Sequence, residues 1–223
     1  MSEFILKLEN ITKIYPNGFV ANEKINMSIR KGTIHALAGE NGAGKSTLMK
    51  VLFGIETHEE GTIIYQDEPV DIKSPSHAIE LGIGMVHQHF MLVPSMTVAE
   101  NLIIGIEETN HLGFIEMDKV NQLVSDFAQK FNFRINPKQR IRDLSVGQKQ
   151  KVEIIKALIR GAKLLILDEP LHGLDNRNRR LVKDVIEAFC RRQNKTMIMV
   201  THYKEELPAC IDHSIFLLRH TND

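Results

Sequence analysis

The sequence predicts an α/β fold with a largely parallel β-sheet, and two observations carry this prediction. First, short runs that are apolar on every side alternate with segments of helical spacing, which is typical of strands that helices cover on both faces. These runs are residues 34–38, 83–86, 164–167, 197–200 and 215–218. Second, the glycine-rich segment AGENGAGKST, residues 38–47, joins the first run to a helical stretch, as phosphate-binding turns of α/β folds do.

A small antiparallel sheet is expected in the first third of the chain. Residues 4–8, 25–29 and 61–65 partly alternate between apolar and polar side chains and are linked by turn residues. Antiparallel strands have this pattern. Further along, Ser74-Pro75 and Gly82 are expected to bound a short helix.

The strand pattern disappears between about Thr97 and Arg160, which predicts a helical insertion. Thr97 and Glu100 have the spacing of a capping box, and residues 118–131 carry apolar side chains at helical intervals. At 223 residues the chain is long enough to bury one sizeable core. We therefore expect a single domain over residues 1–223, with an antiparallel β and phosphate-loop core at about 1–94 and 161–223 and a helical subdomain at about 95–160.

The composition argues against several classes of protein. Lys plus Arg and Asp plus Glu number 28 each, so no net field attracts nucleic acid or anionic lipid. Cys190 and Cys210 lie far apart in the sequence and do not have a zinc-site spacing, so we expect buried, unreactive thiols in a reducing compartment. The N-terminus has no signal-peptide pattern, and no stretch approaches the roughly 20 apolar residues of a membrane span. The expectation is a soluble, cytoplasmic chain that reaches a membrane only through a partner.

The segment GENGAGKS, residues 39–46, satisfies the pattern G-x-x-x-x-G-K-[ST] between a strand and the helical segment 46–53. Its glycines allow successive backbone N–H groups to turn around an anion, and the helix start adds partial positive charge. Lys45 is expected to reach the β- and γ-phosphates, and the Ser46 hydroxyl to bind Mg²⁺. An ordinary glycine-rich turn between strand and helix is the alternative, and the strand-loop-helix setting disfavours it.

Polar residues follow two of the predicted parallel strands. Asp168 and Glu169 end the run LLILDE, at the sheet edge where the phosphate loop opens. Asp168 suits the magnesium shell through water, which leaves Glu169 to orient or deprotonate an attacking water. His202 follows the strand at 197–200 and is placed to sense the γ-phosphate, although such a histidine taken alone is more often a capped core residue.

A second helix start is presented at Ser145, which forms an S-x-x-Q capping box with Gln148 ahead of an apolar helical face at 152–159. Its unpaired N–H groups are available to a ligand. From these residues alone, a solvated cap explains the pattern equally well.

Together and in this order, the motifs resemble those of the ATP-binding cassette ATPases, the motor subunits of ABC transporters, and the resemblance covers essentially the whole chain. It adds to the phosphate loop, the acidic strand end and His202 three further motifs. These are Gln88 in VHQHF, the signature LSVGQ at 144–148, and the aspartate loop Gly173-Leu174-Asp175. The resemblance implies hydrolysis of ATP with Mg²⁺ as cofactor.

The resemblance also assigns roles to residues. It implies catalytic roles for Glu169, His202, Gln88 and Asp168, and magnesium contacts from Ser46, Gln88 and Asp168. Two cassettes are expected to stack head to tail, so that Ser145 and Gly147 of one contact the γ-phosphate held by the other. Tyr15 matches the position of an aromatic ring that stacks on adenine, with a plain strand-edge aromatic as the alternative. The implied nucleotide contacts are Tyr15, Gly39, Glu40, Asn41, Gly42, Ala43, Gly44, Lys45, Ser46, Thr47, Ser145, Gly147, Gln148 and Asp175.

Within this family, the sequence around the phosphate loop and VHQHF looks most like that of the importers of sugars and nucleosides, and the segment HQHF favours nucleosides. The resemblance implies a subunit that powers solute uptake through separate membrane permease subunits, on which the helical insertion docks. A solute-binding protein takes part indirectly, nucleic acid does not, and the subunit lies on the inner face of the cell membrane. A metal site at His87 and His89 is not expected, because no further ligand lies nearby in sequence.

The match has departures. Val146 stands where signature segments often have a second glycine, Lys151 where many have arginine, and Leu171-His172 where small residues are usual; the last two bear on packing between cassettes. Importers of this type usually join two cassettes in one polypeptide, whereas this chain carries one set of motifs. It is therefore either an N-terminal half or a stand-alone subunit.

Other functions remain as alternatives. Chromosome and DNA-repair ATPases place a long coiled coil between the motif that contains Gln88 here and the signature. In this chain only about 57 residues separate Gln88 from Ser145, and they show no sustained heptad repeat. A module that binds nucleotide without hydrolysis would not need Glu169, Lys45 and His202 together. An exporter or a lipoprotein-release system stays open.

Overall fold

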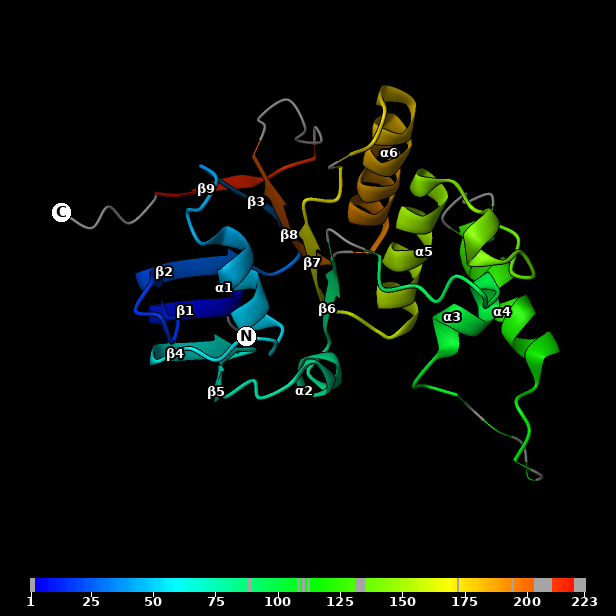
Figure 1. Ribbon diagram of the computed structural model, residues 1–223, viewed down its shortest axis with the longest axis horizontal. Helices are drawn as coiled ribbons and strands as arrows, with labels where there is room; N and C mark the ends of the chain where they lie inside the picture. The colour runs from blue at the N-terminus through cyan, green and yellow to red at the C-terminus, as the bar shows by residue number, and fades with distance from the viewer. Residues whose placement is uncertain are drawn as a thin grey trace.

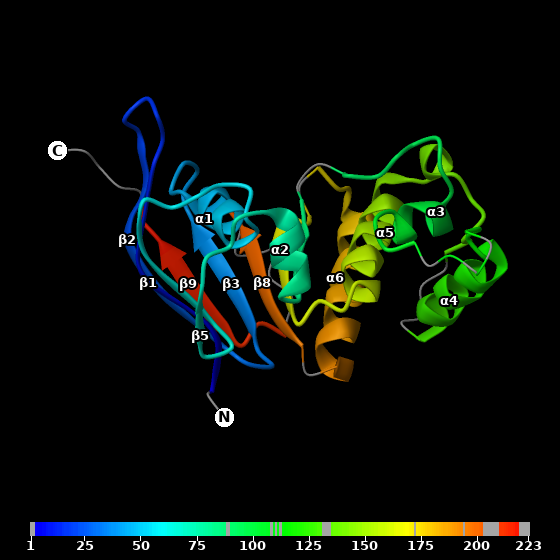
Figure 2. The same ribbon diagram turned by 90° about the horizontal axis from the view of Figure 1, so that it is seen from below.

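The computed structural model describes residues 3–87, 90–107, 109, 111, 113–130, 135–171, 173–193, 195–202 and 210–218. Its elements form an antiparallel sheet, a parallel sheet and a group of helices, arranged side by side in that order (Figures 1 and 2). This arrangement confirms the predicted α/β fold with an added antiparallel sheet and a helical part.

The central sheet is parallel, with the strand order β6-β7-β8-β3-β9. Its strands are β3 (Ile34–Gly39), β6 (Ile83–Val86), β7 (Leu164–Asp168), β8 (Thr196–Thr201) and β9 (His213–Leu217). All five predicted strands are present. Because the strands run in one direction, the carboxyl ends of β3, β7 and β8 meet at one edge of the sheet, which is where ligands bind in such folds.

The prediction that helices cover every one of these strands is wrong for β9. This strand lies at the end of the sheet, where its one described strand neighbour is β3. Of its residues only Leu217 is buried, and Phe216 is 57% exposed. A run of apolar residues does not distinguish such an edge strand from a central one.

The antiparallel sheet has the strand order β2-β1-β4-β5. Its strands are β1 (Phe4–Ile14), β2 (Val20–Arg30), β4 (Glu60–Tyr65) and β5 (Glu68–Val70). β1 and β2 are longer than the alternating pattern predicts, because register shifts along their pairing interrupt the alternation. The hairpin that joins β1 to β2 contains Tyr15 and Phe19.

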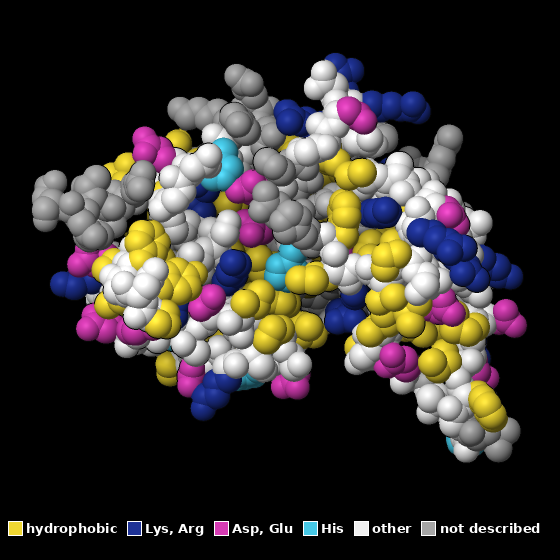
Figure 3. Space-filling view, viewed as in Figure 1, with side chains coloured by type: hydrophobic (Ala, Val, Ile, Leu, Met, Phe, Trp, Pro, Cys, Tyr) yellow, Lys and Arg dark blue, Asp and Glu magenta, His cyan; other side chains and the backbone are white. Residues whose placement is uncertain are grey.

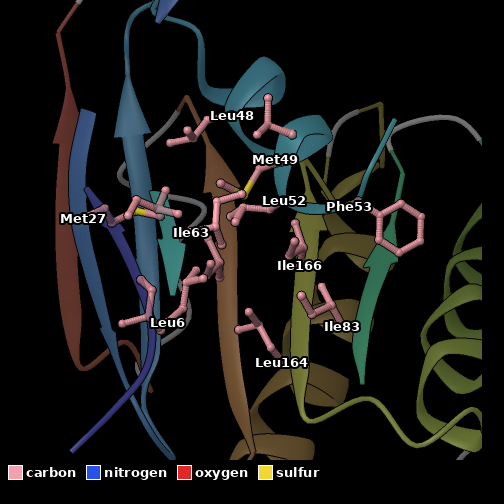
Figure 4. Packing of buried hydrophobic residues seen from close by; sticks show 14 of the residues in the cluster. Leu6, Met27, Leu48, Met49, Leu52, Phe53, Ile63, Ile83, Leu164 and Ile166 are labelled. Atoms are coloured by element: carbon pink, nitrogen blue, oxygen red, sulfur yellow. The ribbon is translucent and has the colours of Figure 1, made fainter. Parts of the chain in front are cut away.

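The first helix, α1 (Lys45–Leu52), lies between the two sheets and fills one hydrophobic core. Its Leu48, Met49 and Leu52 pack among side chains of both sheets, such as Leu6 of β1 and Ile166 of β7 (Figure 4). This core fixes the direction in which α1 leaves β3.

The opposite face of the parallel sheet is covered by α5 (Val146–Ile159) and α6 (Asn176–Gln193), which form a second core with β3, β7 and β8. The remaining helical elements are α2 (Pro75–Glu80), α3 (Val98–Ile103), α4 (Met117–Lys130) and η1 (Ile141–Asp143). α5 also packs against α3, so it joins the core to the helical part.

The local helix signals are confirmed. Ser74 caps α2 with Pro75 in its first turn, and both predicted capping boxes, Thr97 with Glu100 and Ser145 with Gln148, are formed. Cys210 is only partly buried, in contrast to the expectation of a buried thiol. Within the described part of the chain, no helix combines the length and the apolar character needed to cross a bilayer.

Candidate nucleotide-binding site

The glycine-rich loop 39–46 is held between two strands that are distant in sequence. A β-carbon at Gly44 would lie 2.1 Å from the backbone oxygen of Ala21 on β2, and one at Gly39 would lie 2.3 Å from the backbone oxygen of Leu217 on β9. Gly44 also has a φ of 82°, in the left-handed region, and no side chain caps the helix start there. The first N–H groups of α1 are therefore available to an anion.

Lys45 extends back over this loop. Its Nζ donates hydrogen bonds to the carbonyl oxygens of Gly39 at 2.7 Å and Glu40 at 2.8 Å, and lies 3.1 Å from Nδ1 of His202. Burial lowers the pKa of Lys45, while the nearby carboxylates Glu169 and Asp168 raise it. The ammonium is thus placed at the mouth of the loop.

His202 lies between the loop lysine and Glu169. Its Nδ1 is 3.1 Å from Nζ of Lys45 and 3.4 Å from the carbonyl oxygen of Gly39, and an ionised carboxylate such as Glu169 can only accept a hydrogen bond. Nε2 then donates to Oε1 of Glu169. A chain of hydrogen bonds therefore runs from the loop lysine through His202 to Glu169.

Glu169 has an unusual backbone. Its φ is 50°, a conformation that costs free energy in a non-glycine residue and is often found at functional positions. Its backbone N–H donates to the carbonyl of Val200 at 3.2 Å, which fixes the turn to β8. This conformation turns the carboxylate towards the loop.

The Ser46 hydroxyl donates a hydrogen bond of 3.0 Å to Oδ1 of Asp168. Burial raises the pKa of Asp168, and the hydrogen bond from Ser46 opposes this shift. One hydroxyl and one carboxylate side by side are the protein ligands that Mg²⁺ takes when phosphates complete its shell. The residues therefore fit the implied magnesium ion, although no cluster of three or more metal-binding side chains occurs in the described part of the chain.

These groups line one pocket of about 300 Å³. Its walls are Phe19, Ala21, the loop residues 41–47, Glu169 and His202. Asp168 lies behind Ser46. The structure thus brings together the phosphate loop, the acidic strand end and His202, as the sequence predicts.

Two residues near this pocket were not predicted. Phe19 lines it from the β1-β2 hairpin. Asn22 is buried behind the loop and donates from Nδ2 to the carbonyl of Gly44 at 3.2 Å. The available sequence signal was an aromatic residue within a turn, four positions after Tyr15. Tyr15 itself lies next to the loop, with its hydroxyl 3.3 Å from Oγ1 of Thr47.

The signature and the aspartate loop lie elsewhere. Ser145, Gly147, Gln148 and Asp175 are not among the described residues that line this pocket. Asp175 and Gly147 are linked through Asn178, because Asp175 accepts two hydrogen bonds of 2.8 Å from Asn178, and the Asn178 side chain packs against Gly147. The side chain of Val146 is exposed. Gln88, like His89 and His172, lies outside the described residues.

A second pocket of about 180 Å³ lies between the core and α5. Its walls include the apolar residues Phe53, Ile79 and Met85, together with Glu153 and Lys156 of α5 and Arg160, which caps the end of this helix. The surface is also hollowed between the core and the helical part in Figure 3.

A family model described as ABC transporter matches residues 22–172. The chain belongs to the ABC transporter family. Among relatives of this ABC protein, the guanosine import ATP-binding protein NupO of Bacillus subtilis is 51% identical over 75% of the chain. The nucleoside import ATP-binding protein NupA of Lactococcus lactis subsp. cremoris is 40% identical over 98% of it. The chain spans 32% and 42% of the lengths of these two relatives.

Solved structures of ABC cassettes share the fold. The ADP conformation of MJ1267, an ATP-binding cassette of an ABC transporter, superimposes with a TM-score of 0.84 at 26% identity and covers 97% of this chain and 88% of that one. For CbiO1 of Clostridium perfringens, part of the ABC transporter complex CbiONQ, the TM-score is 0.81 at 27% identity, over 97% and 85%. The ABC fold that the sequence motifs predict is confirmed.

Proposed function

We propose that this ABC chain binds ATP with Mg²⁺ in the 300 Å³ pocket and hydrolyses it to ADP and phosphate, as the ATP-binding subunit of an importer. The observation that carries the proposal is the convergence of Lys45, Ser46, Glu169 and His202 on one pocket beside a helix start. Binding, charge compensation and water activation each have a group there.

Each group has a distinct task. The N–H groups of the loop and Lys45 bind the β- and γ-phosphates. On binding, the Lys45 ammonium gives up its hydrogen bonds to the carbonyl oxygens of the loop and donates to phosphate oxygens instead. Ser46 and Asp168, with Gln88, would hold Mg²⁺, which would supply positive charge to neutralise the phosphates. Glu169 accepts a proton from the attacking water or orients it, and His202 holds the Glu169 carboxylate in place and senses the γ-phosphate.

A second cassette completes the site. We propose that Ser145, Gly147, Gln148 and Asp175 contact a nucleotide held by another cassette, either a second copy or a tandem partner. Their separation from the pocket within one chain and the exposed start of α5 support this arrangement. Binding and release of ATP then close and open the pair.

The partner in the membrane is proposed to be a permease. The 180 Å³ pocket between the core and α5, whose lining includes the exposed side chain of Met91, supports docking next to the helical subdomain, which has proposed bounds of about 95–160. The relatives are named for import of guanosine, nucleosides or sugars, and we propose a nucleoside or sugar as the solute. The chain then acts on the inner face of the cell membrane, with a solute-binding protein as an indirect partner and no nucleic acid.

The test compares the ATPase rates and ATP affinities of the wild type and Glu169→Gln. The amide keeps the shape of the side chain but accepts no proton, so we expect unchanged ATP binding and hydrolysis slower by about 100-fold or more. Lys45→Ala should lose both ATP binding and ATP hydrolysis. Equal turnover of Glu169→Gln and wild type would remove Glu169 from the mechanism, and ATP affinity unchanged in Lys45→Ala would remove the loop from the binding site.

A further inference from the structure

One peptide group, which joins Gly44 to Lys45, sets the direction of the first N–H group of α1. Both residues line the 300 Å³ pocket, and no side chain caps the helix at Gly44. A trans peptide group is planar, so the carbonyl of Gly44 and the N–H of Lys45 point in opposite directions. A contact that holds this carbonyl away from the pocket therefore directs the Lys45 N–H into it.

The helix alone holds this peptide weakly. The Gly44 carbonyl accepts one hydrogen bond from within the helix, from the N–H of Leu48 at 2.9 Å. Helix ends fray, and glycine has several backbone conformations open to it that other residues avoid. The orientation of the Gly44 carbonyl therefore needs support from outside α1.

Asn22 of β2 supplies this support. Its Nδ2 donates to the Gly44 oxygen at 3.2 Å, and a β-carbon at residue 44 would lie 2.3 Å from this nitrogen. The contact fixes the orientation of the amide, because a carbonyl oxygen accepts and only the NH₂ group of asparagine donates. Asn22 is 2% exposed and is not among the described residues that line the pocket. It therefore acts on the loop from behind.

Asn22 occupies this position at a cost to stability. Its Oδ1 is buried and has no hydrogen-bond partner among the described residues. Such an acceptor lowers stability, whereas an apolar side chain of the same shape would not. Asn26, on the same strand, is exposed, and its Oδ1 and Nδ2 are both hydrogen-bonded. The contrast indicates that Asn22 serves the loop and not the stability of the sheet.

We propose that Asn22 is a positioning residue for nucleotide binding, whose amide holds the Gly44 carbonyl so that the N–H of Lys45 points at the bound phosphates. The inference rests on the proposed function, because it adds a residue of the antiparallel sheet to the same phosphate site. Asn22 itself does not touch the nucleotide. Since an N–H aimed at the phosphates binds them before hydrolysis and during it, Asn22 contributes to affinity and not to the rate at saturating ATP.

The experiment separates positioning from stability. Dissociation constants for MgATP and for magnesium with inorganic triphosphate are measured by calorimetry, together with ATPase rates and thermal unfolding midpoints. The variants are Asn22→Leu, which keeps the shape of the side chain without its donor, Asn22→Ala and Lys45→Ala. The matched control is Asn26→Leu, the same substitution at an exposed position of the same strand.

We expect Asn22→Leu and Asn22→Ala to weaken the binding of ATP and of triphosphate equally, by about 5- to 10-fold, the value of one hydrogen bond. The unfolding midpoint of Asn22→Leu should equal or exceed that of the wild type, because the unpaired Oδ1 is removed. Its ATPase rate at saturating ATP should stay within about twofold of the wild type. Asn26→Leu should bind both ligands within about twofold of the wild type, as is usual for surface substitutions.

Four results would overturn the inference. Unchanged affinity in both Asn22 variants would show that the Leu48 hydrogen bond is sufficient to fix the peptide. A loss confined to ATP would show that Asn22 acts on the base and not on the phosphates. A lower unfolding midpoint in Asn22→Leu, or an equal loss of affinity in Asn26→Leu, would make the role of Asn22 structural. A wild type that binds neither ligand, or a Lys45→Ala variant that binds both like the wild type, would remove the proposed function, and the inference with it.

Discussion

The side-chain oxygen of Asn178 on α6 lies against the backbone of Gly147 on α5, 2.3 Å from the position that a β-carbon at residue 147 would occupy. Asp175 holds Asn178 in this orientation by accepting hydrogen bonds of 2.8 Å from its backbone N–H and its side-chain amide. A β-carbon at the signature glycine would thus force the Asn178 side chain to shift, independently of any phosphate that Gly147 contacts.

This contact predicts a coupled effect on stability. Gly147→Ala should lower the free energy of unfolding by about 1–3 kcal/mol, because the added methyl group overlaps the Asn178 amide. In an Asn178→Ala background the same substitution should cost much less. Chemical denaturation of the two single variants and the double variant measures the coupling as a double-mutant cycle. Additive free energies would contradict the predicted overlap.

A second prediction concerns the hydrogen bond between Ser46 and Asp168. If these oxygens hold the magnesium ion, Asp168→Asn and Ser46→Ala should each reduce the gain in ATP affinity that Mg²⁺ provides, by about 10-fold, the value of one interaction to a charged group. The measurement compares ATP dissociation constants in excess Mg²⁺ and in a chelator. Ser74→Ala, which removes a helix-capping hydroxyl from α2, is the matched control and should keep the full response. An undiminished gain in both site variants would argue against this pair as ligands.

A third prediction concerns pH and His35 on β3. This side chain is buried, its Nε2 accepts from the backbone N–H of Arg30 at 3.2 Å, and its ring centre lies 4.8 Å from that of His213. Burial, followed by the charge of His213, lowers the pKa of His35 from 6.5 to about 4; Asp212 opposes this shift and Arg30 adds to it. The unfolded chain therefore binds a proton between these pH values that the folded chain does not.

Since the pKa is lowered in the folded state, the stability that neutral His35 contributes is present above about pH 6.5 and is lost as the pH falls towards 4. The free energy of unfolding should fall by at most about 1.4 kcal/mol per pH unit from this group. His35→Gln should flatten this slope, whereas His111→Gln, at an exposed loop position, should not. Denaturation midpoints between pH 7 and 4.5 measure it, and parallel slopes for His35→Gln and wild type would contradict the assignment.

The sequence predicts those parts of the fold and site that depend on local pattern or on strand direction. The five parallel strands, both capping boxes and the convergence of Asp168 and Glu169 on the phosphate loop belong to this group, because parallel strands end at one edge of the sheet. The division into a core and a helical subdomain at residues 95–160 stays a prediction.

The features that the sequence did not predict depend on contacts between distant segments. Gly44 lies against Ala21, and Gly147 against Asn178; each pair is joined by tertiary packing that no local spacing reveals. The position of Phe19 depends on how the hairpin folds over the loop, and the exposure of β9 depends on which strand ends the sheet. Local periodicity contains neither kind of information.

The last prediction concerns Glu153, a buried carboxylate on α5. Its Oε1 accepts a hydrogen bond of 2.6 Å from the backbone N–H of Met91, and two residues further on Asn101 of α3 accepts from the N–H of Val93 at 2.7 Å. Burial raises the pKa of Glu153, and the Met91 hydrogen bond, Lys156 and Arg160 oppose the shift. The segment that contains Met91 and Val93 is thus attached to two helices, α5 and α3, by buried side chains.

Glu153→Ala should free the Met91 amide, because alanine has no side-chain acceptor. We expect hydrogen exchange at Met91 to accelerate by about 10-fold or more, with a loss of roughly 1–3 kcal/mol in unfolding free energy. Glu153→Gln retains an acceptor oxygen and should change exchange at Met91 much less. If exchange at Met91 is as slow in Glu153→Ala as in the wild type, Glu153 does not hold this segment. If it accelerates at Met91 but not at Val93, which Asn101 binds separately, the segment is attached at two independent points, and a permease seated beside Met91 would act on α5 through Glu153.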